Sequence, residues 1–233
     1  MDIEKFIYKT EAHAHSSPAS ICSEIPVKKL VEIYDGLGYN TLVLPNHFEP
    51  SLIQHGKKAA VKAYLNDYKE AVEHSRNSNL NVILGIEIRF TENHNDYLVY
   101  GIDEEFVEKS FDYLDGTIEK FYTEMKNDKN VILQAHPFRD GIKLMPKEFM
   151  DGIETFNMHP NHNSRVSLAC KYVKNNPEML VCGGTDYHHP TQEGCISVNT
   201  KSVKTDSYQF ADVLKSKDFI FDIAGNKVIP YFV

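Results

Sequence analysis

The sequence predicts an α/β fold, and within that class a small α/β barrel of about seven βα units in a single domain. Short apolar runs alternate with helical patterns along most of the chain. No repeat, low-complexity tract or linker-like stretch divides the 233 residues, a length that can bury a core of its own. Histidines and carboxylates recur just after successive apolar runs. An open, doubly wound sheet is the alternative arrangement of the same units.

The first half of the chain is predicted to contain four strands and two helices. The apolar spacing after Pro26 predicts a helix that Gly36 and Gly38 end. A long helix is expected from about Lys57 to Ser75, because apolar residues recur there at helical spacing. Strands are expected at residues 9–13, 41–44, 82–88 and 97–100.

The second half continues the alternation and then loses it. Helical patterns occupy roughly residues 104–127, 164–174 and 207–216, and apolar runs predict strands at 131–135, 152–156 and 179–182. The remaining apolar segments, 196–198 and 219–221, are expected in an irregular tail.

Composition excludes several classes of function. The net charge of −8 disfavours a general nucleic-acid-binding surface, although local metal ions can still attract a small phosphorylated substrate. No apolar run approaches the roughly 20 residues of a membrane span, and the start of the chain does not resemble a signal peptide. The four cysteines form no CxxC pair and are expected to be reduced thiols. A cytoplasmic location is therefore expected.

Seven side chains at the expected strand ends form the main functional pattern. In a barrel these ends converge on one face, and the two histidines of a His-x-His on a strand point the same way. Each histidine alone is as well explained by a core or loop role, but the common placement favours metal binding. Imidazole and carboxylate suit Zn, Mn and Fe, and seven ligands exceed one tetrahedral site, so two or three ions are expected. The ligand candidates are His13, His15, His47, Glu87, His136, Asp186 and His188.

The ordered motifs resemble those of the PHP superfamily of polymerase and histidinol phosphatase domains. The resemblance covers roughly residues 8–190 and rests on His13-Ala14-His15, Asn46-His47, Gly85-Ile86-Glu87, Ala135-His136-Pro137, Glu154-Thr155-Phe156-Asn157 and Thr185-Asp186-Tyr187-His188. It implies a distorted (β/α)7 TIM-like barrel with a two- or three-metal site and phosphoester hydrolysis. His13, His15, Glu87 and Asp186 resemble the ligands of one metal, His47 and His188 those of a second, and Glu87 and His136 those of a third.

Two departures from the family pattern leave ligand positions open. The family often has Asp or His shortly after His-x-His, where this chain offers Cys22 or Glu24, and Glu24 also suits a helix N-terminus. Pro45-Asn46-His47 replaces the frequent Thr-Asp-His. The third site needs a ligand near the fourth strand, for which Asp96 is the candidate and Asp103 and His94 are rivals.

Arg139 follows His136 by three residues, and its planar fork is suited to clamp a phosphate or carboxylate beside the metals. Arg89 and Arg165 are weaker candidates for that role. The predicted reaction is hydrolysis of a small phosphomonoester by a metal-activated water that Asp186 or a neighbouring histidine helps to orient. The alternatives are a nuclease or phosphodiesterase with the same site, a non-catalytic metal-binding domain, and an amidohydrolase-like C–N hydrolase. The last would favour a metal-bridging lysine that the middle strands lack.

Overall fold

The computed structural model describes residues 2–230, whose strands form two six-stranded sheets. In the first sheet, the order is β12-β11-β10-β1-β2-β4, with β1 (Tyr8–Glu11), β2 (Thr41–Leu44), β4 (Asn81–Leu84), β10 (Ile196–Thr200), β11 (Ile220–Ile223) and β12 (Asn226–Val228). In the second, the order is β3-β5-β6-β7-β8-β9, with β3 (His47–Phe48), β5 (Ile86–Arg89), β6 (Asp96–Tyr100), β7 (Val131–Gln134), β8 (Gly152–Asn157) and β9 (Leu180–Gly184).

The two sheets are connected at two places. The parallel pair β2–β4 leads directly into the parallel pair β3–β5, so that the chain passes from one sheet to the other after Leu44 and at Gly85. At the second connection between the sheets, the segment after β1 meets the segment after β9. There Ala14 bridges Tyr187 in parallel, and the Asp186 amide donates to the His13 carbonyl at 2.7 Å. The carboxyl ends of β1 and β9 therefore lie side by side.

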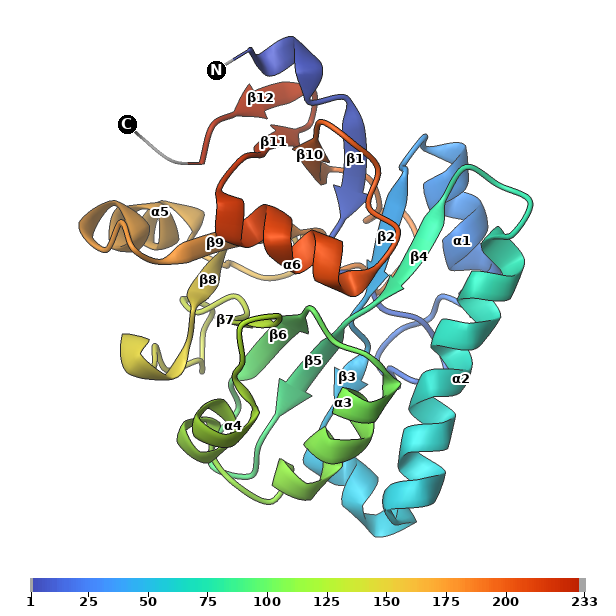
Figure 1. Ribbon diagram of the computed structural model, residues 1–233, viewed down its shortest axis with the longest axis vertical. Coiled ribbons are helices and arrows are strands. Elements are labelled where there is room, and N and C mark those ends of the chain that lie inside the picture. The colour runs from blue at the N-terminus through green and yellow to red at the C-terminus, as the bar shows by residue number, and fades with distance from the viewer. Residues whose placement is uncertain (1, 231–233) are drawn as a thin grey trace.

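The helices cover the outer faces of these sheets (Figure 1). Helices α1 and α2 pack against each other, α2 also packs on β4, α5 packs on β8, and α6 packs on β6 and β9. Buried apolar side chains fill the space between helices and sheets in three clusters. The helices are α1 (Val27–Gly36), α2 (Lys57–Ser75), α3 (Glu104–Ser110), α4 (Ile118–Met125), α5 (Val166–Asn175) and α6 (Ser207–Ser216), with short 3-10 turns η1 (Ile3–Lys5), η2 (Pro50–His55), η3 (Phe111–Tyr113) and η4 (Lys147–Phe149).

The predicted α/β class is confirmed, but a single distorted (β/α)7 barrel is not. Strand β6 runs antiparallel to both β5 and β7, so the expectation of uniformly parallel strands is wrong there. The expected strand at residues 82–88 is broken at Gly85 into β4 and β5. The expected irregular tail is instead an antiparallel extension in which β10 pairs with β1 and β11 pairs with β10.

Within residues 2–230, no helix combines the length and apolar character that crossing a membrane requires.

Candidate metal centre

The eight predicted ligand side chains come from the ends of strands in both sheets and lie together. His13 and His15 follow β1, and His47 begins β3. Glu87 lies in the middle of the group, within 3.3 Å of a ring nitrogen of each of four histidines. The histidines around it are His13, His15, His47 and His136. The remaining members, Asp96, Asp186 and His188, approach the same group from the start of β6 and the end of β9.

Both oxygens of the Glu87 carboxylate face imidazoles. Oε1 lies 3.3 Å from Nε2 of His13 and 3.3 Å from Nε2 of His136, whereas Oε2 lies 3.3 Å from Nε2 of His15 and 2.9 Å from Nδ1 of His47. Burial would raise the pKa of Glu87, but the charges of His13 and His47 hold it well below its usual range. Glu87 is thus an ionised carboxylate whose two oxygens are both surrounded by imidazole nitrogens.

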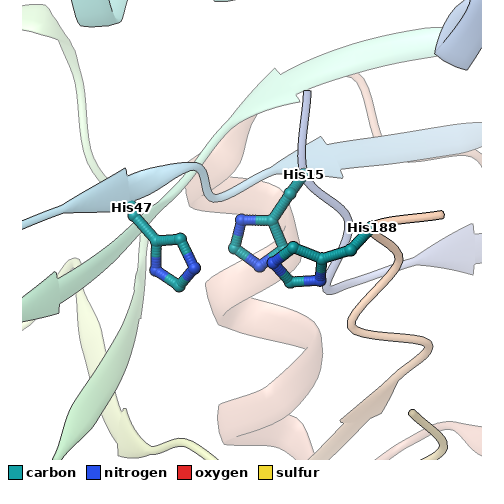
Figure 2. Close-up of side chains that lie close together, drawn as sticks. All are labelled: His15, His47 and His188. Atoms are coloured by element: carbon teal, nitrogen blue, oxygen red, sulfur yellow. The ribbon is translucent and has the colours of Figure 1, made fainter. Parts of the chain in front are cut away.

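Three imidazoles form a second group beside Glu87, those of His15, His47 and His188 (Figure 2). The ring centroid of His15 lies 4.4 Å from that of His47 and 4.2 Å from that of His188. Because the neighbouring imidazoles and burial both disfavour a positive charge, the pKa of His15 is well below its usual value. A neutral imidazole is the form that binds a metal ion.

Hydrogen bonds to the far ring nitrogens set the tautomers of these histidines. Nδ1 of His13 donates to Glu154 at 2.8 Å, Nδ1 of His15 donates to the Ser20 hydroxyl at 3.0 Å, and Nδ1 of His188 donates to the Asp186 carbonyl at 2.8 Å. In the neutral form of each ring, these bonds leave Nε2 with its lone pair on the inner side. Such bonds to carboxylates and carbonyls are the usual supports of metal-binding histidines.

The nitrogen and oxygen atoms at the centre of the group are better arranged to bind divalent ions than to hydrogen-bond with one another. Nε2 of His13, Nε2 of His15, Nδ1 of His47 and both oxygens of Glu87 are buried and have no hydrogen-bond partner of suitable geometry among residues 2–230. Buried polar atoms without partners are costly unless an ion or ligand satisfies them. Three sets of donor atoms lie within 4.8 Å of one another: His15 with His47 and His188, His13 with His15 and Glu87, and His47 with Glu87 and Asp96.

The local charge also favours cations. Burial alone would lower the pKa of His13. The charges of Glu154, Glu87 and Asp186 outweigh burial and raise this pKa well above its usual value. The carboxylates therefore create a negative potential at the His13 ring. A bound divalent ion would balance this negative charge in place of a proton on the ring.

Asp186 connects the ligand group to Arg139. Its Oδ1 faces Nε2 of His13 at 3.5 Å and Nε2 of His15 at 3.4 Å, while Oδ2 accepts from Arg139 at 2.6 Å and from Asn157 at 3.1 Å. Against the effect of burial, the charges of His13, His136 and Arg139 and the nearby His15 ring hold the pKa of Asp186 well below its usual range. Asp186 therefore remains ionised, which suits it to bind cations and orient water rather than to accept a proton.

The alternatives for the open ligand positions lie at different distances from the ligand group. Cys22 lies beside the three-imidazole group, where its thiol interacts with His188 and His47. Partial burial raises the pKa of this thiol, but those interactions outweigh it and lower the pKa to about 6. Glu24 instead faces His189, 3.4 Å away, and lies outside helix α1. Asp103 caps helix α3, and His94 is exposed.

Asp96 reaches the group but has a strong partner of its own. Arg89 donates to both of its oxygens, from Nε and from Nη2, at 2.8 Å each. Oδ2 of Asp96 also lies 3.8 Å from Nε2 of His136. Arg89, which the sequence suggested as a weak phosphate-binding candidate, is therefore engaged by Asp96, and Arg165 binds the Phe138 carbonyl and Asp140.

A pocket of about 270 Å³ opens over the cluster. Its floor is formed by metal-ligand candidates, and Arg89 and Arg139 both contribute to its wall. Burial lowers the pKa of His159 to about 4, so this ring is neutral near pH 7 and can donate or accept a hydrogen bond. The other lining residues include Cys22, Asn161, His162 and His189.

Two buried carboxylates were not predicted as functional residues. Glu154, on β8, receives the His13 ring N–H and the His136 backbone N–H. Glu11, at the end of β1, accepts from the amides of His13 and Thr185 and from the Tyr34 hydroxyl. The available signal was an acidic residue inside an apolar strand, a position at which burial demands a partner.

Taken together, the fold and the cluster define a class of protein: an α/β protein with a buried multinuclear metal-site candidate at its strand ends. No family model and no curated protein matches the sequence. Solved structures do match. A two-domain protein from Bacteroides vulgatus, containing a predicted PHP-like metal-dependent phosphoesterase, aligns with a TM-score of 0.66 at 17% identity, over 95% of this chain and 66% of that one.

Two further solved structures share the fold. PsfC from Pseudomonas syringae aligns with a TM-score of 0.58 at 15% identity, over 87% of this chain and 86% of that one. A protein from Bifidobacterium adolescentis, assigned by prediction to the metal-dependent phosphoesterases, aligns with a TM-score of 0.50 at 14% identity, over 77% of this chain and 87% of that one. The chain thus shares its fold with a protein that contains a predicted PHP-like phosphoesterase, as the resemblance of the motifs implied.

Proposed function

We propose that the chain is a metal-dependent phosphatase that hydrolyses small phosphomonoesters with two or three bound divalent ions, Zn, Mn or Fe. The observation that carries this proposal is the buried ring of inner nitrogens and carboxylate oxygens that lack partners among residues 2–230. The fold shared with proteins described as metal-dependent phosphoesterases supports the reaction class. Bound ions would supply Lewis acidity and an acidified water as nucleophile.

The side chains of the site have three roles: metal binding, orientation of the water and phosphate binding. Glu87 and the histidines hold the ions, and the ionised Asp186 orients the water from the wall of the pocket. Arg139 faces the same pocket and keeps a buried Nε without a partner among the described residues, while its Nη2 binds Asp186. A free guanidinium N–H beside a cation cluster is suited to hold a phosphoryl oxygen.

The size of the pocket and the charge of the chain favour small substrates. About 270 Å³ accommodates a compact phosphomonoester, and the net charge of −8 disfavours extended polyanions.

The test is metal analysis of protein purified without chelator, together with turnover on a panel of phosphomonoesters, diesters, oligonucleotides and amides. His13→Ala should lose metal and phosphomonoesterase activity together. His74→Ala is the matched control, because His74 lies on α2 beside Glu70, away from the cluster. Unchanged metal content and turnover in His13→Ala would refute the proposal. Faster cleavage of oligonucleotides than of any monoester would favour the nuclease, and a trapped phosphoryl-enzyme would contradict the water nucleophile.

A further inference from the structure

The His15 ring can bind a metal through Nε2 only if its proton lies on Nδ1. Nε2 is buried and has no hydrogen-bond partner within residues 2–230. In Figure 2 the ring lies beside those of His47 and His188. A neutral imidazole carries its proton on one nitrogen, and the partner of the outer nitrogen decides which one. That partner is Ser20, whose hydroxyl oxygen lies 3.0 Å from Nδ1.

The Ser20 hydroxyl has only one proton, and that proton is used elsewhere. A hydroxyl can donate one hydrogen bond and accept two. Ser20 donates to Oδ1 of Asn46 at 2.9 Å, and its oxygen accepts from the His47 amide at 2.9 Å. Towards His15 the hydroxyl can therefore only accept. It follows that Nδ1 of His15 carries the ring proton and that Nε2 keeps its lone pair.

The direction of the Ser20 bond depends on how the Asn46 amide is turned, and two contacts with Ser16 fix that orientation. The Ser16 backbone N–H donates to Oδ1 from 2.7 Å, which identifies this atom as the amide oxygen. Nδ2 donates to the Ser16 hydroxyl oxygen at 2.8 Å. The opposite orientation would place the NH₂ group against the Ser16 N–H, leaving two buried donors without an acceptor, which is costly.

Asp67 determines the direction of the last bond in this network. Its side chain is fully buried on α2, and its Oδ2 accepts from the Ser16 hydroxyl and from the Ala19 amide, at 2.9 Å each. Because the proton of Ser16 goes to this carboxylate, the Ser16 hydroxyl oxygen can only accept from Asn46. Every hydrogen bond from Asp67 to the His15 ring thus has one possible direction.

We propose that Asn46 is a positioning residue that sets the metal-binding tautomer of His15 through Ser20. Asp67 holds the Asn46 amide in the orientation that this requires. A helix on the outer face of the sheets thereby determines where the proton lies on a ring at the centre of the site. The inference rests on the metal centre of the proposed function, and it adds residues that act on a ligand candidate without binding metal or substrate themselves.

The test is the tautomer of His15 in metal-free protein. Nuclear magnetic resonance of isotopically labelled protein distinguishes protonated from bare ring nitrogens, at about pH 8, above the ordinary pKa of histidine. His15→Gln identifies the His15 signals by their loss. The wild type should show only the form protonated at Nδ1. In Asn46→Ala the Ser20 proton is free to point at His15, so both tautomers should appear and the dissociation constant for Zn²⁺ should rise about 10- to 100-fold.

Two variants of Asp67 test its part separately. Asp67→Asn keeps an oxygen that can accept from both Ser16 and Ala19, so it should retain the wild-type tautomer and nearly wild-type zinc affinity. Asp67→Ala lets the Ser16 hydroxyl point at Asn46, so the second tautomer should become detectable and zinc affinity should fall. Asn66→Ala is the matched control, because Asn66 is an exposed asparagine on the same helix.

A wild-type His15 protonated at Nε2, or a single unchanged tautomer in Asn46→Ala, would overturn the inference. Equal losses in Asp67→Asn and Asp67→Ala would overturn the role of Asp67. The wild-type and Asp67→Asn spectra still decide the matter if an alanine variant fails to fold. Phosphatase activity in a protein with His15 protonated at Nε2 would leave the proposed function standing. The expected tautomers in a protein without hydrolytic activity would remove the proposed function alone.

Discussion

At the scale of single residues, the metal-ligand candidates depend on partners that orient them. Glu154 binds three neighbours: the His13 ring, the His136 amide and the Asn157 side chain. It thereby fixes the tautomer of His13 and the turn that carries His136. His136 itself has a φ of +32° and Asp186 a φ of +53°, both in the left-handed region that non-glycine residues rarely adopt. Strained backbone of this kind persists where surrounding contacts determine it.

Replacing Glu154 by Gln should therefore weaken metal binding without unfolding the protein. Gln keeps the size of the side chain but removes the charge that supports the His13 ring, so the dissociation constant for Zn²⁺ should rise about 10- to 100-fold. Titration against a competing chelator measures it. Glu148→Gln, at an exposed position, is the control. Equal zinc affinity in the two variants would show that Glu154 does not support a ligand.

Arg139→Ala should impair catalysis through substrate binding. Loss of a charged hydrogen bond costs about 1.5–3 kcal/mol, so kcat/KM should fall roughly 10- to 150-fold, and Arg139→Lys should restore only part of it. Because Asn157 still donates to Asp186, metal content should be retained. Steady-state kinetics with parallel metal analysis tests this, with Arg76→Ala, at the exposed residue that follows α2, as control. Wild-type kinetics in Arg139→Ala would exclude the arginine from the substrate site.

At the scale of elements, the approach of β9 to the segment after β1 requires a residue without a side chain. A Cβ added at Gly184 would lie 2.4 Å from Cβ of His13 and 2.7 Å from its backbone nitrogen. These are parts of the chain that cannot move away without displacing a ligand candidate.

Gly184→Ala should therefore destabilise the protein by about 1–3 kcal/mol and lower metal content at the same time. Gly36→Ala is the opposite case, because an added Cβ in α1 meets nothing within 4 Å and should stabilise by about 0.5–1 kcal/mol. Urea unfolding compares the three proteins. A Gly184→Ala variant as stable and as metal-rich as the wild type would contradict the close approach.

Local sequence patterns predicted the bounds of individual helices and strands, but they did not predict which distant strands pair with each other. Helix α2 and strand β2 have the predicted bounds, because each follows from its own apolar spacing. Gly85 stands at the break between β4 and β5, where an added Cβ would meet Val43 at 3.0 Å and Pro45 at 3.2 Å, a close approach that favours glycine. Strand β10 pairs with β1, far away in sequence, so no local pattern could show that the last strands join the first sheet.

The antiparallel β6 was predictable in principle. Only six residues separate Arg89 from Asp96, and a parallel crossover needs a dozen or more. Seven of the ligand candidates were predicted from the rule that parallel strand ends converge, because that rule needs no side-chain detail, whereas Asp96, at the start of the antiparallel β6, was predicted from the PHP resemblance. The roles of Glu154 and Glu11 could not be predicted from the sequence, because their hydrogen-bond partners lie on strands that are distant in sequence.

At the scale of the whole molecule, Glu11 makes stability depend on pH. Burial raises its pKa to about 7, against hydrogen bonds from His13, Thr185 and Tyr34 that lower it. A raised folded-state pKa means that its stabilising contribution is present below the unfolded value near 4.5 and is lost as the pH rises through about 7.

Glu11→Gln should remove this dependence. Gln can accept from the two backbone amides and donate to the Tyr34 and Thr185 hydroxyl oxygens, so the geometry is preserved. Between pH 4.5 and 8, the free energy of unfolding of metal-free wild-type protein should fall relative to the variant by about 3 kcal/mol. Urea unfolding across this range measures it, and Glu148→Gln should parallel the wild type. Parallel profiles for Glu11→Gln would mean that Glu11 stays ionised in the folded protein.

The meeting of the segments after β1 and β9 also concerns the order in which a ribosome delivers the chain. Asp186 and His188 are synthesised about 170 residues after His13 and His15. The hydrogen bond from the Thr185 hydroxyl to the His13 carbonyl joins these two distant parts of the sequence. The cluster cannot assemble around an ion until residues 186–188 have been synthesised and have emerged. A chain interrupted before residue 186 would expose histidines without their closing carboxylate. Occupancy by metal would therefore distinguish chains that extend past residue 188 from those interrupted before residue 186.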